Sequence, residues 1–271
     1  MKALKLTIAT LVLGIIACSP KANATDLSAT TQLKPESKLE LAQANLKDAE
    51  KYFNSGNAKV IRGDYQGAIA DFTKAIEINP NYGNAYLNRG VARGNLKDYQ
   101  GAIADFTKAI EINPQLAQPY LIRSVARLEL KNYQGAIADS TKAIEINPQL
   151  VEAYLMRSGA RLELKDYQGA IADSTKAIEI NPQLAQPYLI RSVARLELKN
   201  YQGAIADSTK AIKINPQLVE AYFIRGTAGF LSGDKQGAIT DLQKAAELLQ
   251  KQGNKAQAQK VLELIATIKS L

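Results

Sequence analysis

The chain contains no histidine and no tryptophan, and its only cysteine is Cys18. Histidine is the most common general base in enzymes and the most common metal ligand, so its absence removes the usual route to both kinds of site. A single cysteine forms neither an internal disulfide bond nor a zinc site built from several thiolates. There is also no glycine-rich phosphate loop. We therefore predict a protein that is not an enzyme and that uses no cofactor and no metal.

The charge balance is only mildly basic. The 271 residues are 46% hydrophobic and 22% charged, which is typical of a folded soluble protein, and the formal net charge is +8. Removal of residues 1–17 takes away Lys2 and Lys5 and leaves +6, and removal of residues 1–24 also takes away Lys21 and leaves +5. Basic residues gathered into a patch are the usual mark of a nucleic-acid partner. We expect a well-solvated surface and no nucleic-acid partner.

Residues 1–24 have the pattern of a signal peptide. Residues 1–5 form a short basic stretch, and residues 6–17 form an apolar run of 12 residues. A membrane-spanning helix needs roughly 20 such residues, so this run is too short to be an anchor helix. The protein is therefore expected to be exported, and the signal implies a bacterial source.

Two cleavage sites remain open. Ile15-Ile16-Ala17-Cys18 resembles a bacterial lipobox, in which cleavage after residue 17 leaves a lipid on Cys18. Ala22-Asn23-Ala24 is a small-x-small site for cleavage after residue 24. The first predicts a periplasmic or membrane-anchored lipoprotein with a lipid tether at its N-terminus, and the second predicts a secreted protein.

One unit of 34 residues recurs along the body of the chain. The pair Asn-Pro returns at this interval from Asn79-Pro80 to Asn215-Pro216, and Gln-Gly-Ala-Ile-Ala-Asp returns with the same period. Six repeats follow from this register: 49–82, 83–116, 117–150, 151–184, 185–218 and 219–252.

Each repeat is expected to contain two helices. In the third repeat, apolar and small residues follow at helical spacing before and after Lys131-Asn132, which marks a turn. Asn132 and its equivalents can cap the second helix by accepting hydrogen bonds from its first N–H groups. The equivalents are Asp64, Asp98, Asp166, Asn200 and Asp234. The proline of each Asn-Pro pair ends the second helix, because its ring removes a hydrogen-bond donor.

The repeat resembles the tetratricopeptide repeat. In the second repeat the matching residues are Tyr86, Gly90, Tyr99, Ala102, Phe106, Ala109 and Pro114. The resemblance implies an all-α fold, a right-handed α-solenoid superhelix of six 34-residue helix-turn-helix repeats. A single repeat cannot bury its own apolar face, so stacking supplies the core.

Shorter segments flank the repeats. Residues 25–36 read as a polar linker, and residues 37–48 as an N-terminal helix that opens with a possible capping box at Ser37 and Glu40. Residues 253–271 are expected to contain a capping helix, about Lys255–Ser270, with one apolar stripe that covers the end of the array. The stripe consists of Ala258, Val261, Leu262, Ile265 and Ile268.

Some positions depart from the pattern. Phe72 and Phe106 give way to serine in the next three repeats, at Ser140, Ser174 and Ser208, and to Leu242 in the last. If the position is buried, we expect either looser packing or a hydroxyl that is hydrogen-bonded to its own helix backbone.

Paired arginines recur on one helix face, at Arg89/Arg93, Arg123/Arg127, Arg157/Arg161 and Arg191/Arg195. They could grip acidic ligands, but an aspartate recurs in step with them, from Asp105 to Asp241. We favour the structural interpretation, in which the first arginine of each pair lies within hydrogen-bonding reach of the aspartate on the second helix of its own repeat.

Tetratricopeptide arrays usually bind peptides or helices in a concave groove lined by the first helices. By this resemblance the lining residues are Leu121, Val125, Leu128, Leu155, Leu162, Leu189, Val193, Leu196 and Phe223, with Glu129, Glu163 and Glu197 at one rim. Asn54, Asn57 and Asn88 are compatible with a clamp for a carboxylate tail, but the basic residues of such a clamp are missing in the middle repeats. An alternative is that the apolar residues pack between adjacent first helices.

The expected function is a non-enzymatic scaffold, a monomer that holds a protein or peptide partner in this groove outside the cytoplasm. An acidic rim around an apolar lining suits an apolar or amphipathic segment with some positive charge. The alternative function is a structural or self-assembling envelope protein whose arrays stack through their ends. That alternative loses an interface if the last repeat covers the stripe of the final helix.

Overall fold

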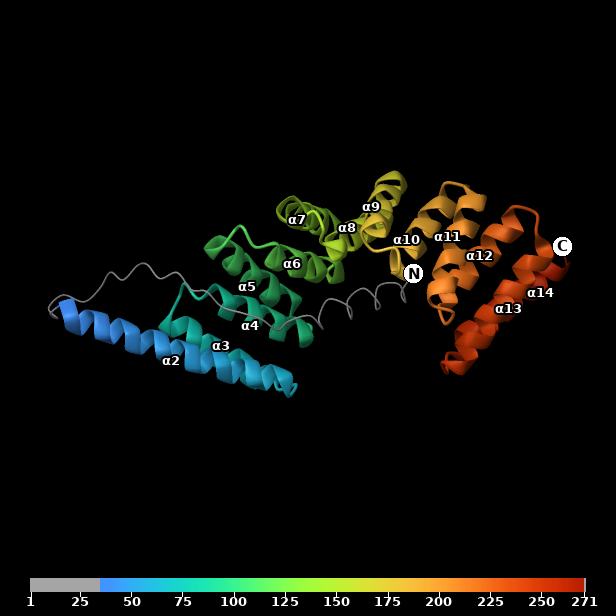
Figure 1. Ribbon diagram of the computed structural model, residues 1–271. Coiled ribbons are helices and arrows are strands. Elements are labelled where there is room, and N and C mark those ends of the chain that lie inside the picture. The colour runs from blue at the N-terminus through green and yellow to red at the C-terminus, as the bar shows by residue number, and fades with distance from the viewer. Residues whose placement is uncertain (1–34, 271) are drawn as a thin grey trace. The chain divides into compact units, whose positions relative to one another are not determined.

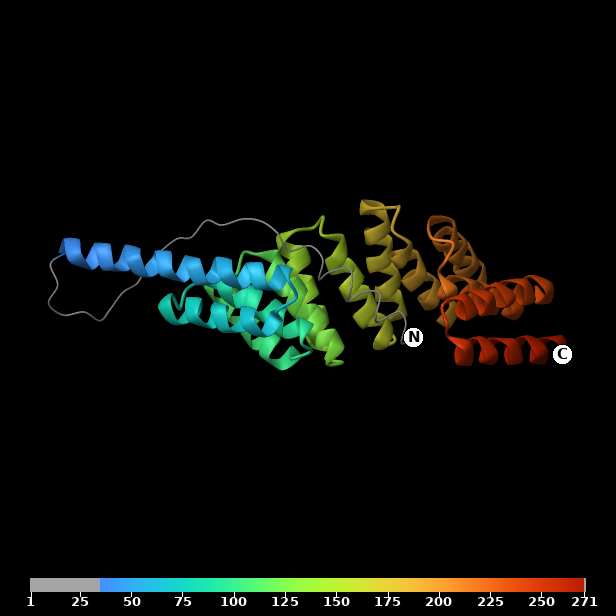
Figure 2. The same cartoon turned by 90° about the horizontal axis from the view of Figure 1, so that it is seen from below.

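The computed structural model describes residues 35–270, and over this range it contains thirteen α-helices and no β-strand (Figures 1 and 2). The predicted signal peptide, Cys18 and most of the predicted linker lie outside the described residues. The helices are α2 (Pro35–Ile61), α3 (Tyr65–Ile78), α4 (Gly83–Asn95), α5 (Tyr99–Ile112), α6 (Ala117–Glu129), α7 (Tyr133–Ile146), α8 (Val151–Glu163), α9 (Tyr167–Ile180), α10 (Ala185–Glu197), α11 (Tyr201–Ile214), α12 (Val219–Leu231), α13 (Lys235–Lys251) and α14 (Lys255–Ser270).

The described helices belong to two compact units. One contains α2–α7 and ends at Pro148, and the other begins at Gln149 and contains α8–α14. Within each unit every helix packs against the next one along the chain, as both views show for α2 with α3 and for α13 with α14. Each repeat is therefore a hairpin of a first helix and a second helix, and hairpins stack within a unit. This confirms the predicted all-α array of helix-turn-helix repeats.

Every second helix begins with the same capping hydrogen bond. The side chain of Asp98 accepts from the N–H of Gly101 at 2.9 Å, and that of Asn132 accepts from the N–H of Gly135 at 2.9 Å. A Cβ atom on Gly101 would collide with the cap, which explains why glycine recurs at this position. All six predicted caps are confirmed.

The turn between the two helices of a repeat requires a left-handed backbone. Glycine supplies it in the first and last repeats, at Gly63 (φ +76°) and Gly233 (φ +98°). In the four middle repeats a lysine adopts the same conformation, at Lys97, Lys131, Lys165 and Lys199, with φ between 59° and 64°. A side chain disfavours this region of backbone space, so the four lysines are strained.

The helices of a hairpin approach closely where small residues meet. In the second repeat the Phe106 ring leaves no room for a Cβ atom on Gly90. In the first repeat the Phe72 ring likewise leaves no room for a Cβ atom on Gly56. In the next three repeats both positions are serine, and all six serines are fully buried. The glycine of one helix and the aromatic ring of the other have therefore been replaced together.

The paired serines differ in their hydrogen bonds. On the first helices, Ser124, Ser158 and Ser192 each donate to the carbonyl of the leucine three residues earlier. On the second helices, the hydroxyls of Ser140, Ser174 and Ser208 have no hydrogen-bond partner among the described residues. Of the two alternatives that we expected, looser packing or a hydroxyl bonded to its own helix backbone, the hydrogen bond is therefore absent at these three serines.

Both ends of the array differ from its middle. The N-terminal helix expected over 37–48 is continuous with the first helix of the first repeat, and together they form α2. At the other end, α14 packs its stripe against α13, where Ala258, Val261, Ile265 and Ile268 are buried with Leu242 and its neighbours. Leu262 is the exception, with 38% of its surface exposed. The predicted capping helix is confirmed, and four of the five residues of its stripe are covered by the last repeat.

Candidate functional site

The residues predicted to line the groove lie on the first helices, and most of them are covered. Leu121, Val125, Leu155, Leu162 and Leu189 are each at most 9% exposed. Leu128, Val193 and Leu196 are half-buried, and Phe223 is 39% exposed. In the second unit, Leu189 packs in a cluster with Tyr188, Ala211, Ala221 and Ile224 that also takes in Val193 and Leu196. With the exception of Phe223, these apolar side chains therefore contribute mainly to the packing between helices.

Two of the exposed large apolar side chains of the second unit lie on α12. Phe223 and Leu231 are 39% and 49% exposed and lie eight residues apart on this helix. Phe230, also on α12, is half-buried against the cluster that holds α14. Among the predicted lining residues, Phe223 is thus the one whose side chain is open to a partner.

The predicted acidic rim is accessible. Glu129 and Glu197 are exposed, and Glu163 is half-buried. The Tyr167 hydroxyl at the start of α9 donates to Glu197 at 3.3 Å, and burial together with the Glu197 charge raises the pKa of Tyr167 above 10.0. The pKa of Tyr99 is raised in the same way by burial and Glu129. Each of these glutamates therefore lies beside the tyrosine that begins the preceding second helix.

The three asparagines of the first two repeats do not form a clamp for a carboxylate tail. Asn88 Nδ2 donates to Asn57 Oδ1 at 2.7 Å, while Asn54 is exposed. The nearby Asn95 donates to the carbonyl of Val91 at 2.9 Å in its own helix. Three of these four asparagines are therefore engaged with one another or with their own helix.

The first arginine of each pair is held inside its own repeat. Arg89, Arg123, Arg157, Arg191 and Arg225 each bind the aspartate sixteen residues later, with shortest N–O distances of 2.6 to 2.8 Å. The aspartates are Asp105, Asp139, Asp173, Asp207 and Asp241. In each case Nε donates to one carboxylate oxygen and Nη2 donates to the other. This bidentate arrangement is the strongest geometry for an arginine–carboxylate pair. The structural interpretation of the arginines is therefore confirmed.

These arginines also join neighbouring repeats, which the sequence analysis missed. Within the first unit, Arg89 Nη1 donates to Thr73 Oγ1 of the preceding repeat at 3.1 Å, and Arg123 does the same to Thr107 at 2.8 Å. Within the second unit, Arg191 reaches Thr175 and Arg225 reaches Thr209. A threonine that recurs two residues after the aspartate was the available signal.

The second arginine of each pair binds the same aspartate. Nη1 of Arg93, Arg127, Arg161 and Arg195 lies 2.8 to 2.9 Å from the carboxylate. In the first repeat Lys59 takes this place, 2.7 Å from Asp71, and Ser55 donates to the same carboxylate at 2.6 Å. Burial alone would raise the pKa of Asp71, but the hydrogen bonds from Lys59 and Ser55 outweigh it and lower the pKa below the ordinary value of 3.8.

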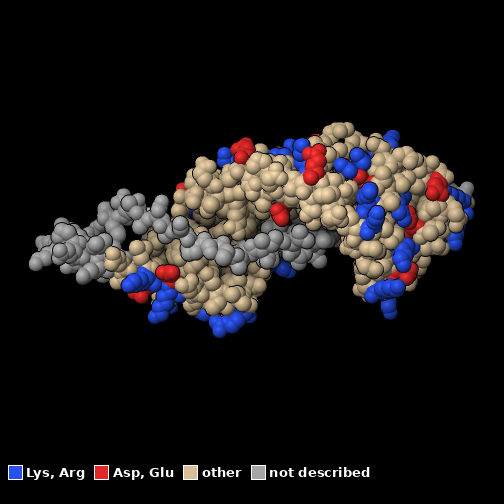
Figure 3. All heavy atoms as spheres, in the orientation of Figure 1, with Lys and Arg blue, Asp and Glu red and all other residues tan. Residues whose placement is uncertain are grey.

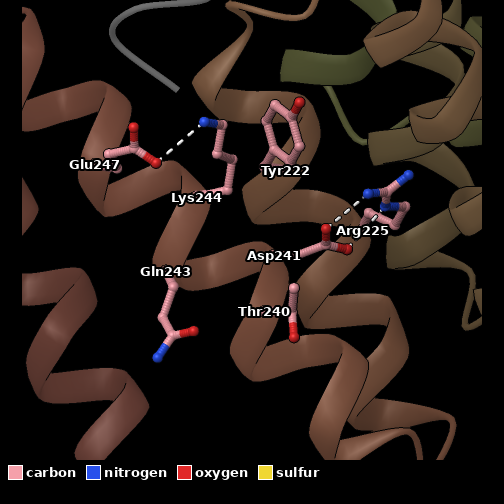
Figure 4. Close-up of a pocket in the computed structure, with 7 residues that line it drawn as sticks. All are labelled: Tyr222, Arg225, Thr240, Asp241, Gln243, Lys244 and Glu247. Atoms are coloured by element: carbon pink, nitrogen blue, oxygen red, sulfur yellow. Dashed lines mark hydrogen bonds and ion pairs between the residues drawn. The ribbon is translucent and has the colours of Figure 1, made fainter.

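A pocket of about 400 Å³ lies on the last repeat, between α12 and α13 (Figure 4). Tyr222 and Arg225 line it from α12, and Asp241, Lys244 and Glu247 line it from α13. Its charges are paired, since Arg225 binds Asp241 and Lys244 lies 3.0 Å from Glu247. Hydrogen bonds from Lys251 and Lys244 lower the pKa of Glu247. The charged groups that line the pocket are therefore paired with one another.

The described residues lack two other kinds of site. No group of aspartate and glutamate side chains there could hold a metal ion, and no helix there is both long and apolar enough to span a bilayer. On the face drawn in Figure 3, lysines and arginines lie interspersed with aspartates and glutamates. That distribution is what we expect of a mildly basic, well-solvated surface.

Comparison with known protein families identifies the repeat in five places. A model described as TPR repeat matches residues 56–97, and two models described as tetratricopeptide repeat match 83–116 and then 117–150, 151–184 and 185–218. No curated protein sequence matches the chain. Together the family matches extend over more than half of the chain and agree with the predicted register from the second repeat to the fifth.

Several solved structures share the fold. A tetratricopeptide repeat protein from Parabacteroides merdae is 18% identical, with a TM-score of 0.65 over 82% of this chain and 93% of that one. PilW, described as a widely conserved type IV pilus biogenesis factor, is 18% identical, with a TM-score of 0.67 over 79% of this chain and 98% of its own. YrrB, described as a TPR protein with an unusual peptide-binding site, is 19% identical, with a TM-score of 0.58 over 70% and 97%. At these identities the likeness shows the fold.

Proposed function

The chain belongs to the tetratricopeptide repeat family, whose arrays generally serve as scaffolds for protein–protein interaction, and from this premise we propose that it binds a protein partner on the faces of its first helices and catalyses no reaction. The partner segment is apolar or amphipathic and carries positive charge. The array acts as a monomer, outside the cytoplasm, with or without a lipid tether at Cys18, and it binds no nucleic acid.

The observation that carries this proposal is the α12 face. Phe223 and Leu231 expose apolar surface, while Glu197 exposes negative charge on the neighbouring first helix, α10. α10 and α12 pack against each other within one unit, so the apolar and acidic groups belong to adjoining helices. An apolar surface beside carboxylates suits a segment with both apolar and basic side chains. The peptide-binding site named for YrrB, a protein of the same fold, also supports the proposal.

The competing proposal of arrays that stack through their ends has less support. α14 covers the last repeat, and four of the five residues of its stripe contribute to the core. Its outward face carries mostly lysine, glutamine and glutamate, together with Leu262 and Leu264, which are 38% and 36% exposed. A polar outer face on a terminal helix is the usual way in which a repeat array is made soluble.

Photo-crosslinking at single positions tests the binding face. We would place the photoreactive amino acid p-benzoylphenylalanine at position 223 and, as a matched control, at position 262. Phe223 and Leu262 are 39% and 38% exposed, so the two probes have nearly the same solvent exposure. Irradiation in envelope extracts should give a discrete protein adduct from position 223 that position 262 does not give.

Charge reversal supplies the second arm. Glu197→Lys should weaken the adduct at position 223 if the partner segment is basic, whereas Lys176→Glu on the outer face of α9 should leave it unchanged. The same adducts from positions 223 and 262, or none from position 223, would contradict the proposal. Leu121, Leu155 and Leu189 are unsuitable for this test, because they are buried and a charge there would unfold the array.

A further inference from the structure

Five of the six repeats place a basic side chain at one position between their two helices. In the second to fifth repeats an arginine Nη1 lies 2.8 to 2.9 Å from the repeat's aspartate. The same Nη1 donates to the backbone carbonyl of a glycine on the second helix, at 2.9 to 3.3 Å. In the first repeat Lys59 contacts the equivalent acceptors, Asp71 at 2.7 Å and the Gly67 carbonyl at 3.4 Å. A carboxylate and a carbonyl together therefore define a place for a cation.

The sixth repeat keeps the acceptors but has no basic side chain there. Gly229 stands where the arginine or lysine is found in the other repeats, while Asp241 and Gly237 stand at the acceptor positions. Among the described residues, the only basic group within ion-pair distance of Asp241 is Arg225. Lys235, which begins the same helix, instead donates to the Lys269 carbonyl at 3.4 Å.

Space and access remain at this place. A Cβ atom added to Gly229 would meet no atom closer than 3.7 Å. The Asp241 side chain is 13% exposed, compared with 3 to 4% for the aspartates of the second to fifth repeats. Those repeats leave the second arginine 22 to 27% exposed, so a group at this place is in contact with solvent. Asp241 also lines the pocket in Figure 4, where its carboxylate points toward Arg225, whereas Gly229 and Gly237 do not line that pocket.

We propose that Asp241 and the Gly237 carbonyl form a binding site for the guanidinium group of an arginine side chain on a partner protein. The Arg225–Asp241 pair is electrically neutral, and a bound guanidinium would restore the charge that the pair of arginines gives each of the four preceding repeats. A guanidinium is the group found here in four of the five repeats that have a cation, with Nη1 2.8 to 2.9 Å from the carboxylate and 2.9 to 3.3 Å from the carbonyl. In the first repeat the lysine reaches the carbonyl only at 3.4 Å. This inference rests on the proposed function, because the occupant belongs to a partner protein, but its acceptors Asp241 and Gly237 lie on α13, whereas Phe223 and Leu231 lie on α12.

The probe is N-acetyl-arginine amide, which carries one guanidinium and no other charge. The full-length chain is labelled with ¹⁵N-glycine, and the amide signals of Gly229 and Gly237 are followed at constant ionic strength. Gly203 is the internal control, because it is the equivalent of Gly237 in the fifth repeat. In that repeat Arg191 and Arg195 both bind Asp207, so the place is already occupied. We expect the Gly229 and Gly237 signals to shift saturably, and the Gly203 signal to stay in place.

Two variants and two ligands complete the test. Gly229→Arg supplies the missing guanidinium from the chain itself and should abolish the shift at Gly237, whereas Gly229→Ala adds no cation and should keep it. N-acetyl-lysine amide should bind more weakly, and the uncharged isostere N-acetyl-citrulline amide should cause no saturable shift. The proposal is overturned if Gly237 and Gly203 respond alike, if citrulline matches arginine, or if Gly229→Arg leaves the shift unchanged.

Discussion

Lysine is an unusual residue for the turn inside a repeat. Lys97, Lys131, Lys165 and Lys199 hold φ near +60°, whereas the first and last repeats have glycine at this position. A left-handed backbone costs a residue with a side chain roughly 1–2 kcal/mol, and glycine avoids this cost. Glycine, however, loses more conformational entropy on folding, which cancels part of that advantage. The four middle repeats are therefore less stable than their packing alone would make them.

Replacing one of these lysines by glycine should stabilise the protein. Lys165→Gly should raise the free energy of unfolding by about 0.5–1 kcal/mol, measured by urea denaturation followed by circular dichroism. Lys176→Gly is the control, because Lys176 lies inside α9 and glycine there should lower the free energy by about 1 kcal/mol. A loss of stability in Lys165→Gly would show that the turn is not strained.

Asp71 makes the first repeat sensitive to acid. Its pKa is lowered below 3.8 in the folded protein, so the folded state favours the charged form. That stabilisation is fully present above the unfolded pKa and is lost as the pH falls through the folded pKa. We expect the wild type to exceed Asp71→Asn in stability from pH 7 down to about 4, and the difference to shrink below pH 4. Urea midpoints of both proteins from pH 7 to pH 2 measure this, and a constant difference would contradict it.

Within the hairpin, the two helices are matched in pairs of residues. Glycine faces phenylalanine in the first two repeats, serine is paired with serine in the next three, and Gly226 faces Leu242 in the last. Close packing explains the coupling, because a bulky residue on one helix needs the smallest residue on the other. The spacing of the helices is thus set by both positions together.

A double-mutant cycle in the fourth repeat tests this coupling. Ser174→Phe alone should destabilise the protein by about 1–3 kcal/mol, because the ring has no room beside Ser158. Ser158→Gly alone should cost about 1 kcal/mol. The double variant copies the pair Gly90 and Phe106, and it should be at least about 1 kcal/mol more stable than the sum of the single changes predicts. Additive effects in urea denaturation would show that the two positions do not meet.

For the whole protein, attachment to a membrane depends on residues outside the described range. If Cys18 carries a lipid, metabolic labelling with radioactive palmitate should mark the mature protein, and Cys18→Ser should abolish the label and release the protein from membranes. A lipid chain provides about 0.8 kcal/mol of membrane affinity per buried CH₂ group, so its loss is readily detected by fractionation. Mass spectrometry supplies the control, since a mature protein that begins at Thr25 would show cleavage after Ala24 and exclude the lipid.

Much of the repeat could be predicted from residues close together in the chain. A cap such as Asn132 bonds to Gly135 three residues away, and a proline after Ile112 stops its own helix, so both effects are fixed by the local sequence. The pairing of Arg89 with Asp105 was also predictable, because an internal repetition of both residues in step reveals a contact within the unit.

The tertiary structure decided which surfaces remain free. Leu121, Leu189 and Phe223 hold the same position in their repeats, yet two are buried and one is exposed, because exposure depends on how neighbouring helices close over a side chain. The hydrogen bonds from the arginines to threonine likewise join residues that are far apart in sequence. The same is true of the ion pair between Arg225 and Asp241, which has only one cation. The sequence by itself determined the period, the helices and their caps, since these arise from local interactions. Packing between helices determined the accessible face and the incomplete cation site, since both depend on distances that no local pattern contains.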